Sequence, residues 1–384
     1  MPVRILHLCF SCIYPDNFAY QENILPRINH EDGHDVRILA STETFVDNTH
    51  LGYVEPSEYV TEYGVPIKRL PYMSVGNGFL THKIRKYPGV YDEIAAFAPD
   101  IIFCHGLQFW SVRDVIRYKK AHPAVKLYAD THTDYYTSAT NWLSLHILHR
   151  GFYRYLVRKA LPYLEKYFCI SDECRRFSVE NYGVPEELME FYPLGGIPPT
   201  EEAYQAHRAA RRAELGLQPD ELLLVHAGKL EPQKKTDALL RAFAAVPELK
   251  ARLAVIGSIP EEHKAELLAQ MDADPRVTYL GWKSGDDLQE YLCAADLYCQ
   301  PGKVSAIMQN AVCCRCPVML YPHPDYKEGY DYGNILWEKD EADMSRVFRQ
   351  LAAGEIDLAA LGRGSERCAK ELLDYRTLAA RLYR

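Results

Sequence analysis

Long apolar segments are missing from this sequence, and their absence excludes the simplest membrane architecture. No run approaches the ~18–20 consecutive apolar residues that a bilayer-spanning helix needs. Positive charge is also scarce, because 52 Asp and Glu outweigh 44 Lys and Arg and leave a net charge of -8. This balance argues against nucleic acid as the main partner. The first residues lack the layout of a secretory signal peptide, so we expect the chain to open directly with a strand.

Paired metal-ligand motifs are missing too, although the chain has eleven cysteines. Cys9 and Cys12 form one C-x-x-C pair, and Cys313, Cys314 and Cys316 form a cluster. Neither group has a second pair or suitably spaced histidines nearby, so a structural zinc site is not indicated. We interpret the cysteines as small buried hydrophobic residues in a reducing compartment, which predicts a cytoplasmic protein.

The composition predicts two globular domains. The chain has 384 residues, of which 48% are apolar and 25% are charged. Glycines and prolines at 195–199 interrupt an alternation of strand and helix patterns, so we place the interdomain linker within 193–200. The predicted domains are 1–195 and 200–365, and the helical segment 366–384 is predicted to pack back on the first domain.

Short apolar runs alternate with helical patterns in both halves of the chain. The predicted strands are 3–10, 36–40, 67–70, 99–106, 125–129 and 167–170, followed by 222–225, 251–256, 278–280, 297–299 and 318–321. This order predicts an α/β fold with two doubly wound, Rossmann-like parallel sheets. His105, His132 and Asp134 lie at the ends of predicted strands, and ligands bind at that edge of an open α/β sheet.

A glycine and two lysines follow the first predicted strand of the second half. Gly228 opens a turn, Lys229 and Lys234 flank the loop, and a helical pattern begins directly afterwards. Backbone N–H groups, the helix dipole and two ammonium groups together favour a bound anion. The alternative is a solvated loop with two surface lysines.

Residues 143–167 combine basic and aromatic side chains in one or two predicted helices. Such a stretch can lie on an anionic membrane surface, here the inner face of the membrane. The alternative, which we favour, is an ordinary helix whose arginines extend along its apolar surface to reach water.

Seven motifs in order resemble the GT-B glycosyltransferases, in particular the large retaining group that uses nucleotide sugars. Examples are 33–36 (GHDV), 99–106 (PDIIFCHG), 228–234 (GKLEPQK), 294–301 (AADLYCQP) and 314–318 (CRCPV). The resemblance implies two Rossmann-like domains facing a cleft, with a UDP- or GDP-linked sugar on the second and a glycan or lipid-linked glycan acceptor on the first. It also implies retention and no metal ion or other cofactor.

The resemblance implies roles for individual residues. Lys229 and Lys234 stabilise the charge that builds on the leaving diphosphate, and His132 faces the transferred sugar. The remaining candidates are Gly228, Ser258, Trp282, Gly302, Ser305, Gln309 and Asn310 for the donor, and Asn17, Tyr20, His105 and Asp134 for the acceptor.

One departure from the family pattern concerns its two acidic residues. Gly302 and Asn310 stand where the family has glutamates, and neither can carry charge. We expect backbone N–H groups within 302–305 to cradle phosphate instead. The leading hypothesis is a hexosyl- or N-acetylhexosaminyl-type transferase for surface-polysaccharide assembly. The alternatives are a non-catalytic scaffold subunit that lost its acidic pair and a nucleotide-sugar epimerase.

Overall fold

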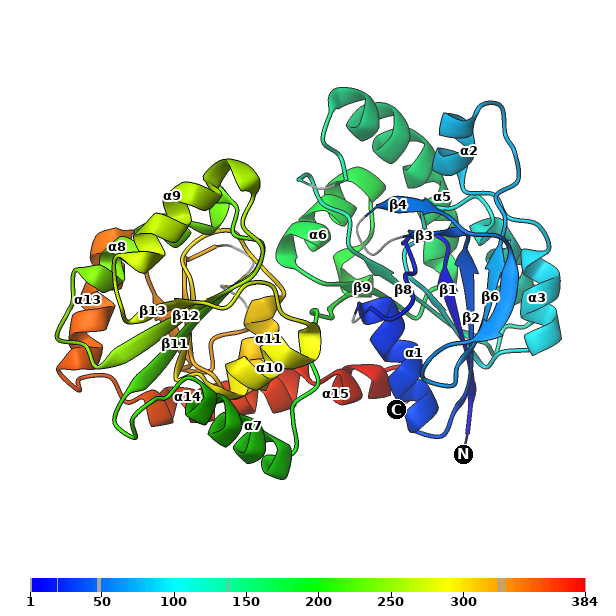
Figure 1. The fold of residues 1–384 in the computed structure, drawn as a ribbon. Helices are drawn as coiled ribbons and strands as arrows, with labels where there is room; N and C mark the ends of the chain where they lie inside the picture. The colour runs from blue at the N-terminus through cyan, green and yellow to red at the C-terminus, as the bar shows by residue number, and fades with distance from the viewer. Residues whose placement is uncertain are drawn as a thin grey trace. The chain divides into compact units, whose positions relative to one another are not determined.

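The chain forms two compact units, which Figure 1 shows as a ribbon. The computed structural model describes residues 2–18, 20–46, 50–136, 138–323, 326 and 329–383. Unit 1 comprises Met1–Pro193 and Leu378–Arg384, and unit 2 comprises Leu194–Thr377. Of the C-terminal segment predicted to return to the first domain, only 378–384 group with unit 1, whereas 366–377 belong to unit 2.

Unit 1 is built on one sheet with helices between its strands. Its elements in chain order are β1 (Arg4–Cys9), α1 (Gln21–Glu31), β2 (Asp35–Ser41), β3 (Glu43–Phe45), β4 (Leu51–Tyr53), β5 (Ser57–Val60), β6 (Pro66–Leu70), α2 (Gly78–Ile84), α3 (Val90–Phe97), β7 (Ile101–Cys104), α4 (Val112–Ala121), β8 (Lys126–Thr131), η1 (Ser144–Tyr153), α5 (Arg154–Ala160), η2 (Leu161–Tyr163), β9 (Lys166–Cys169), α6 (Asp172–Phe177), η3 (Ser178–Tyr182), η4 (Glu186–Leu188) and β10 (Met189–Phe191).

The strand order of this sheet is β10-β9-β8-β7-β1-β2-β6-β5. Every pairing is parallel except that of β5 with β6, and β3 and β4 form a separate antiparallel pair. Its central strands read as uninterrupted apolar runs because helices cover both faces, and all four residues of β7 are buried. The six strands predicted for this half correspond to β1, β2, β6, β7, β8 and β9.

The helical segment predicted at 143–167 starts as predicted but ends earlier. It runs without a break through the π-helical η1, α5 and η2, and Lys166 already opens β9. Trp142, Leu143 and Ile147 are each at least 60% exposed at its start. Within the described residues, no helix combines the length and the hydropathy required to cross a bilayer.

Unit 2 repeats the strand–helix alternation. Its elements are α7 (Glu201–Glu214), β11 (Leu222–Ala227), η5 (Pro232–Lys234), α8 (Thr236–Ala244), β12 (Ala251–Ile256), α9 (Glu261–Asp272), β13 (Val277–Tyr279), α10 (Gly285–Ala294), β14 (Leu297–Gln300), α11 (Ile307–Cys313), β15 (Val318–Leu320), β16 (Ile335–Trp337), α13 (Glu341–Ala352), α14 (Leu358–Cys368) and η6 (Ala369–Leu373), and α15 (Tyr375–Ala380) follows.

The six strands of unit 2 are all parallel, in the order β13-β12-β11-β14-β15-β16. Helices α8, α9 and α13 cover one face of this sheet, and α7, α10, α11 and α14 cover the other (Figure 1). The two parallel sheets confirm the predicted α/β class. The interpretation of the cysteines as small hydrophobic residues also agrees with the structure, because all eleven are free and all except Cys12 are buried.

A buried arginine holds the loop after β1 in place. Arg69 on β6 is 2% exposed, and its guanidinium donates to the Tyr59 hydroxyl at 2.9 Å and to the Ser41 carbonyl at 3.1 Å. It also donates to the Tyr14 carbonyl at 2.9 Å and to the Asp16 carboxylate at 3.0 Å. The planar fork of donors thus joins β2, β5 and the loop that precedes α1.

We expect Arg69→Ala to lower the free energy of unfolding by about 3–5 kcal/mol, because it leaves buried carbonyls and a carboxylate without their donor. Lys68→Ala on the same strand is the matched control. Its ammonium is 32% exposed and pairs with Glu93, so a loss of about 1 kcal/mol or less is expected. Urea unfolding of the two variants measures the difference. Equal midpoints would show that the hydrogen bonds of Arg69 do not stabilise the fold.

Candidate active site

Parallel pairing places a histidine and an aspartate side by side at the carboxyl edge of the first sheet. Cys104 on β7 pairs with Ala129 on β8, so the next residues, His105 and Asp130, are neighbours. His105 Nδ1 lies 2.9 Å from Asp130 Oδ2, and the Gly106 N–H donates to Asp130 Oδ1 at 3.0 Å. Both side chains are buried. This edge therefore contains a carboxylate that is fully removed from water.

A chain of hydrogen bonds continues from His105 into the interior. His105 Nε2 lies 3.2 Å from His7 Nδ1, and His7 Nε2 lies 2.9 Å from the amide oxygen of Asn29 on α1. Because that oxygen only accepts, His7 carries its proton on Nε2 and accepts on Nδ1. His105 must then donate from Nε2 to His7 and from Nδ1 to the carboxylate of Asp130. The geometry therefore makes His105 a doubly protonated cation.

The electrostatics of the cluster agree with this assignment. Burial disfavours the charged form of His105, but the Asp130 carboxylate outweighs burial and raises the pKa to about 9. Burial and the charge of His105 lower the pKa of His7 to about 3, so His7 stays neutral. Burial alone would raise the pKa of Asp130, and the adjacent His105 instead holds it well below its ordinary value.

His132 is the exposed end of this cluster. Its side chain is 39% exposed, and Nε2 lies 3.7 Å from Asp130 Oδ2. Burial works against protonation of this ring, yet the nearby Asp130 carboxylate raises its pKa overall. The predicted pair of His132 and His105 is thus brought together around one carboxylate. The prediction that His105 contacts an acceptor is corrected, because this ring is buried and both its nitrogens are occupied.

The other acceptor candidates have local structural roles. Asn17 adopts a left-handed backbone with φ 61°, and its N–H donates to Glu62 at 3.2 Å. Tyr20 is 43% exposed and caps α1 with its carbonyl. Asp134 accepts from the Tyr136 N–H at 2.8 Å, as in a local turn. Contact of these three side chains with an acceptor stays a prediction.

In unit 2, Lys234 folds back over Gly228. Gly228 has φ 136°, which side chains rarely allow, and a Cβ added there would lie 3.8 Å from the ammonium nitrogen of Lys234. That ammonium donates to the Lys303 carbonyl at 3.2 Å, and the residue is only 7% exposed. No described carboxylate lies within ion-pair distance of it. Burial and the nearby charge of Lys303 lower the pKa of Lys234 to about 8.

Gly302 has no side chain, so its backbone packs directly against the loop that carries Lys234. A Cβ on Gly302 would lie 2.1 Å from the Gln233 carbonyl oxygen and 2.8 Å from Lys234 Cα. The same carbonyl accepts from the Lys303 N–H at 2.9 Å. Gly302 is therefore required by the close approach of two backbones, and it positions Lys234.

A buried histidine that the sequence did not single out supports the loop from below. His226 on β11 is fully buried, and its Nδ1 donates to the Cys299 carbonyl at 2.8 Å. Its Nε2 is therefore the acceptor for the Thr236 hydroxyl at 2.9 Å, at the start of α8. Burial lowers the pKa of His226 to about 4, so this neutral tautomer persists near pH 7.

The prediction of a phosphate cradle at 302–305 is wrong for two of its N–H groups. Lys303 donates to Gln233, and Ser305 donates to the Tyr326 hydroxyl at 3.3 Å. Helix α11 begins after this segment, at Ile307. These two N–H groups therefore already have partners within the chain.

The two amide side chains predicted to contact the donor, Gln309 and Asn310, lie in different environments. Gln309 is buried, and when its amide is oriented to match its surroundings, the amide nitrogen donates to the carbonyls of Ser305 at 3.2 Å and Ala306 at 3.0 Å. The contact of Gln309 with a ribose stays a prediction. Asn310 is exposed on α11, with its Oδ1 3.0 Å from where a Cβ on Gly196 would lie. Its predicted contact with the donor is compatible with this placement.

The remaining donor candidates are exposed. Lys229 is 68% exposed and pairs with Glu231 at 2.9 Å, and this partner raises its pKa. Ser258 accepts through its carbonyl from the Leu230 N–H at 2.8 Å. Trp282 is 73% exposed. Their contacts with a donor stay predictions.

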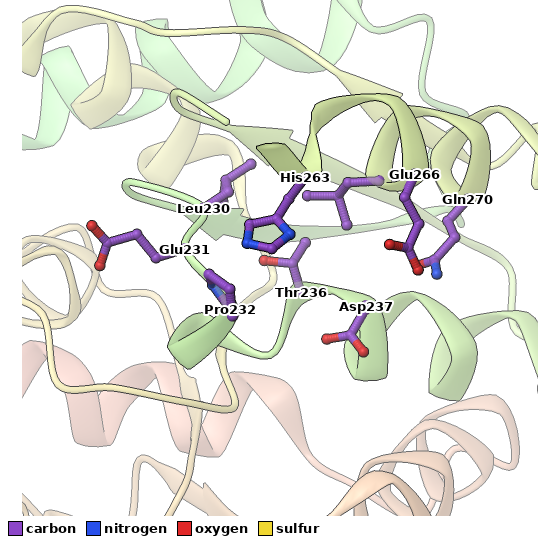
Figure 2. A pocket seen from close by; sticks show the side chains of 9 residues that line it. Leu230, Glu231, Pro232, Thr236, Asp237, His263, Glu266 and Gln270 are labelled. Carbon is purple, nitrogen blue, oxygen red and sulfur yellow. The ribbon is translucent and has the colours of Figure 1, made fainter. Parts of the chain in front are cut away.

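A hollow of about 280 Å³ beside the lysine loop is chemically different from the Lys234 site (Figure 2). Its lining residues are Leu230, Glu231, Pro232, Thr236, Asp237, His263, Glu266, Leu267 and Gln270. Three carboxylates among them would repel a diphosphate, and Lys234 does not line it. Within the described residues, no three His, Cys, Asp or Glu side chains are arranged to hold a metal ion.

Two parallel-sheet units, each with a polar cluster at or near its carboxyl edge, define a GT-B fold. Residues 30–195 match the family model for Glycosyltransferase Family 4, and residues 221–353 match the model for Glycosyl transferases group 1. The chain therefore belongs to the GT-B glycosyltransferases of this group.

Curated relatives share part of the chain. Over 119 residues it is 33% identical to D-inositol 3-phosphate glycosyltransferase from Mycobacterium sp. (strain KMS), covering 29% of this chain and 27% of that protein. Over 193 residues it is 29% identical to the enzyme of the same name from Saccharomonospora viridis, covering 46% and 45%. The chain thus spans less than half of the length of these two relatives.

Solved structures share the fold over nearly the whole chain. The Anabaena protein HepE in complex with UDP matches with a TM-score of 0.64 at 15% identity, covering 99% of this chain and 98% of that one. A glycosyltransferase from Rickettsia africae ESF-5 matches with a TM-score of 0.66 at 12% identity, covering 99% and 96%. At these identities the likeness establishes the GT-B fold.

We expect ¹⁵N-edited NMR of histidine-labelled protein to show His105 protonated on both nitrogens at pH 7, with a midpoint near pH 9 because of Asp130. His7 should remain the neutral Nε2–H tautomer from pH 5 to about pH 9. In Asp130→Asn, the carboxylate is gone and burial should move the His105 midpoint below its ordinary value. A neutral His105 at pH 7 in the unmodified protein would refute the hydrogen-bond assignment.

Proposed function

We propose that this protein transfers a sugar from a UDP- or GDP-linked donor to a glycan or lipid-linked glycan, with retention and without a metal ion. The transferred group would be a hexosyl or N-acetylhexosaminyl unit, as in surface-polysaccharide assembly. Unit 2 would hold the nucleotide diphosphate, and unit 1 would supply His132 at the sugar. In this proposal the Lys234 site and the His105–Asp130–His132 cluster act on the same donor molecule.

The observation that carries this proposal is the ammonium of Lys234. It is almost fully buried, lies close to the Gly228 turn and has a carbonyl but no described carboxylate as its close partner. Burying a cation without a counter-charge is costly, so a site that does so is suited to an anionic ligand. A departing diphosphate would supply the missing negative charge.

The chemistry of glycosyl transfer explains why this charge is useful. As the glycosidic C–O bond breaks, the sugar gains oxocarbenium character and the β-phosphate gains negative charge. An ammonium already desolvated beside the leaving group stabilises that charge more strongly than one in water. Lys229, which is exposed, can swing toward the same phosphates at the cost of its contact with Glu231.

His132 is the group of unit 1 best placed to act on the sugar. Its ring is partly exposed, whereas Asp130 and His105 behind it are buried. Asp130 favours the protonated ring, which could donate a hydrogen bond to a sugar hydroxyl. The cationic His105 in turn keeps Asp130 ionised, so His105 is a positioning residue in this scheme.

Relatives support parts of this proposal. HepE has been crystallised with UDP and with UDP-glucose, which supports a nucleotide-sugar donor here. WaaG, a glycosyltransferase involved in lipopolysaccharide biosynthesis, shares the fold with a TM-score of 0.61. The curated relatives are named for D-inositol 3-phosphate, so a phosphorylated cyclitol joins the acceptors to be tested. We retain a cytoplasmic location and a membrane contact through 143–167 as part of the proposal.

We expect Lys234→Ala to lower kcat/KM for transfer by roughly 100- to 1,000-fold, because it removes a preorganised charge from the leaving group. The melting temperature should stay the same or rise, since the buried ammonium costs stability. Lys250→Ala is the matched control, because Lys250 is exposed in the same unit and its ammonium pairs with Asp220 at 2.9 Å. Radiolabelled donors and a panel of acceptors measure transfer.

Other outcomes of that assay distinguish the alternatives. Conversion of the donor sugar without any acceptor would identify an epimerase. Failure of the folded, unmodified protein to bind or turn over any nucleotide sugar would indicate a scaffold subunit. Normal transfer by Lys234→Ala would remove this lysine from the mechanism.

The affinity for UDP or GDP should fall as the pH rises through about 8, because Lys234 loses its proton there. Phosphate groups are already ionised, since their second pKa is about 6. Folding responds with the opposite sign. The pKa of Lys234 is lowered from 10.5 to about 8, so between these two pH values the folded state binds fewer protons than the unfolded chain, and this group's cost to stability is lost progressively across that range.

Isothermal titration between pH 7 and pH 9.5 measures this dependence. Lys303→Gln should move the midpoint upward, because the Lys303 charge is the second cause, after burial, of the lowered pKa. An affinity that stays constant over this range would show that Lys234 does not hold the diphosphate.

A further inference from the structure

A second concentration of charge lies on unit 1, on residues outside the His105–Asp130–His132 cluster. A hollow of about 510 Å³ opens beside α4 and α5 and the segment that follows α2. Five cationic side chains line it, and a single carboxylate accompanies them among the described lining residues. These side chains are Lys86, Arg113, Arg117, Lys120, Lys159 and Asp114.

The charges of this hollow are largely uncompensated. Arg117 Nη2 lies 3.9 Å from Asp114 Oδ1, at the outer limit of an ion pair. For the other four cations, no described carboxylate lies within ion-pair distance. The chain as a whole carries a net charge of -8, so this cluster of positive charge is a local exception and not a consequence of composition.

Four of these five cations, all except Lys86, lie over aromatic rings. The pairs, with the distance from the cation to the ring centroid, are Arg117–Tyr91 (3.7 Å), Arg113–Trp110 (4.6 Å), Lys120–Tyr163 (5.4 Å) and Lys159–Tyr155 (5.6 Å). A cation–π contact orders a side chain without neutralising its charge, and it leaves the N–H donors free. The hollow is therefore preorganised for an anion.

We propose that this hollow binds clustered phosphate groups, as found in a diphosphate or in a phosphorylated headgroup. Arginine guanidinium groups match phosphate oxygens with paired hydrogen bonds, and lysines add point charges. A volume of about 510 Å³ lies in the usual range of small-molecule sites and exceeds the space one phosphate needs. This inference does not depend on the proposed transferase activity.

The same phosphate chemistry has two sources, a soluble metabolite or a lipid at a membrane surface. The helical segment η1 leads directly into α5, and exposed Trp142, Leu143 and Ile147 lie at its start. These apolar side chains would suit a membrane surface, whereas the hollow alone would suit a soluble ligand. The experiment therefore includes both.

Inorganic pyrophosphate is the first probe, titrated calorimetrically into the full chain carrying Lys234→Ala so that the proposed donor site does not contribute. One bound pyrophosphate is expected. Pyrophosphate binding should weaken at least tenfold when Arg113→Gln, Arg117→Gln and Lys120→Gln are added. The charge-matched control adds Lys250→Gln, Arg346→Gln and Arg363→Gln in unit 2, which are all exposed, and should leave binding unchanged.

Flotation with vesicles identifies the source, using phosphatidylglycerol with phosphatidylcholine against phosphatidylcholine alone. Binding to the anionic vesicles that the three hollow substitutions abolish would identify a lipid headgroup. Pyrophosphate binding without vesicle binding would identify a soluble ligand. The proposal is overturned if neither probe binds at millimolar concentration, or if the hollow variant, folded by its melting temperature, binds either probe as well as the control does. Binding of an RNA oligonucleotide alone would also overturn it.

Discussion

The constraint that organises this part of unit 2 is a buried charge. The ammonium group of Lys234 is held out of water, and no described carboxylate lies beside it. Solvation would draw Lys234 outward, and the backbone prevents it. The contact of Gly302 with the Gln233 carbonyl fixes the loop from one side, and His226 fixes the start of α8 from below. Below about pH 8, where Lys234 is charged, a bound anion would recover the energy lost by burying the ammonium, which couples ligand binding to the local fold.

Unit 1 also buries a charged group, but there the opposite charge is already present. Its buried carboxylate, Asp130, is compensated in advance by the cationic His105, and the charge on that ring is fixed by the tautomer of His7. Proton positions are thus determined along a chain from Asn29 to His132. The electrostatic energy of a compensated ion pair changes little when a ligand binds, whereas that of an uncompensated ammonium changes strongly. The first arrangement suits orientation of a sugar, and the second suits stabilisation of a leaving group.

The sequence predicted the parallel strands well because helices cover both faces of each sheet, so the strands read as apolar runs such as 101–104. It also predicted the surroundings of Lys234, because a strand, a glycine and a helix start do lie next to it, while the anion that this lysine would bind stays a prediction. It failed where partners are distant in the chain. The hydroxyl of Tyr326 occupies the Ser305 N–H, and the approach of Gln233 to Gly302 depends on tertiary packing. The role of His7 follows from strand register, which local pattern does not specify.

The loss of the acidic pair also becomes intelligible in these terms. A glutamate at position 302 would have its Cβ 2.1 Å from the Gln233 carbonyl oxygen, so this chain could accept one only by moving the loop that presents Lys234. The glycine therefore allows closer packing of this loop. Asn310 is exposed on α11, so the close backbone packing that requires a glycine at position 302 does not apply to it.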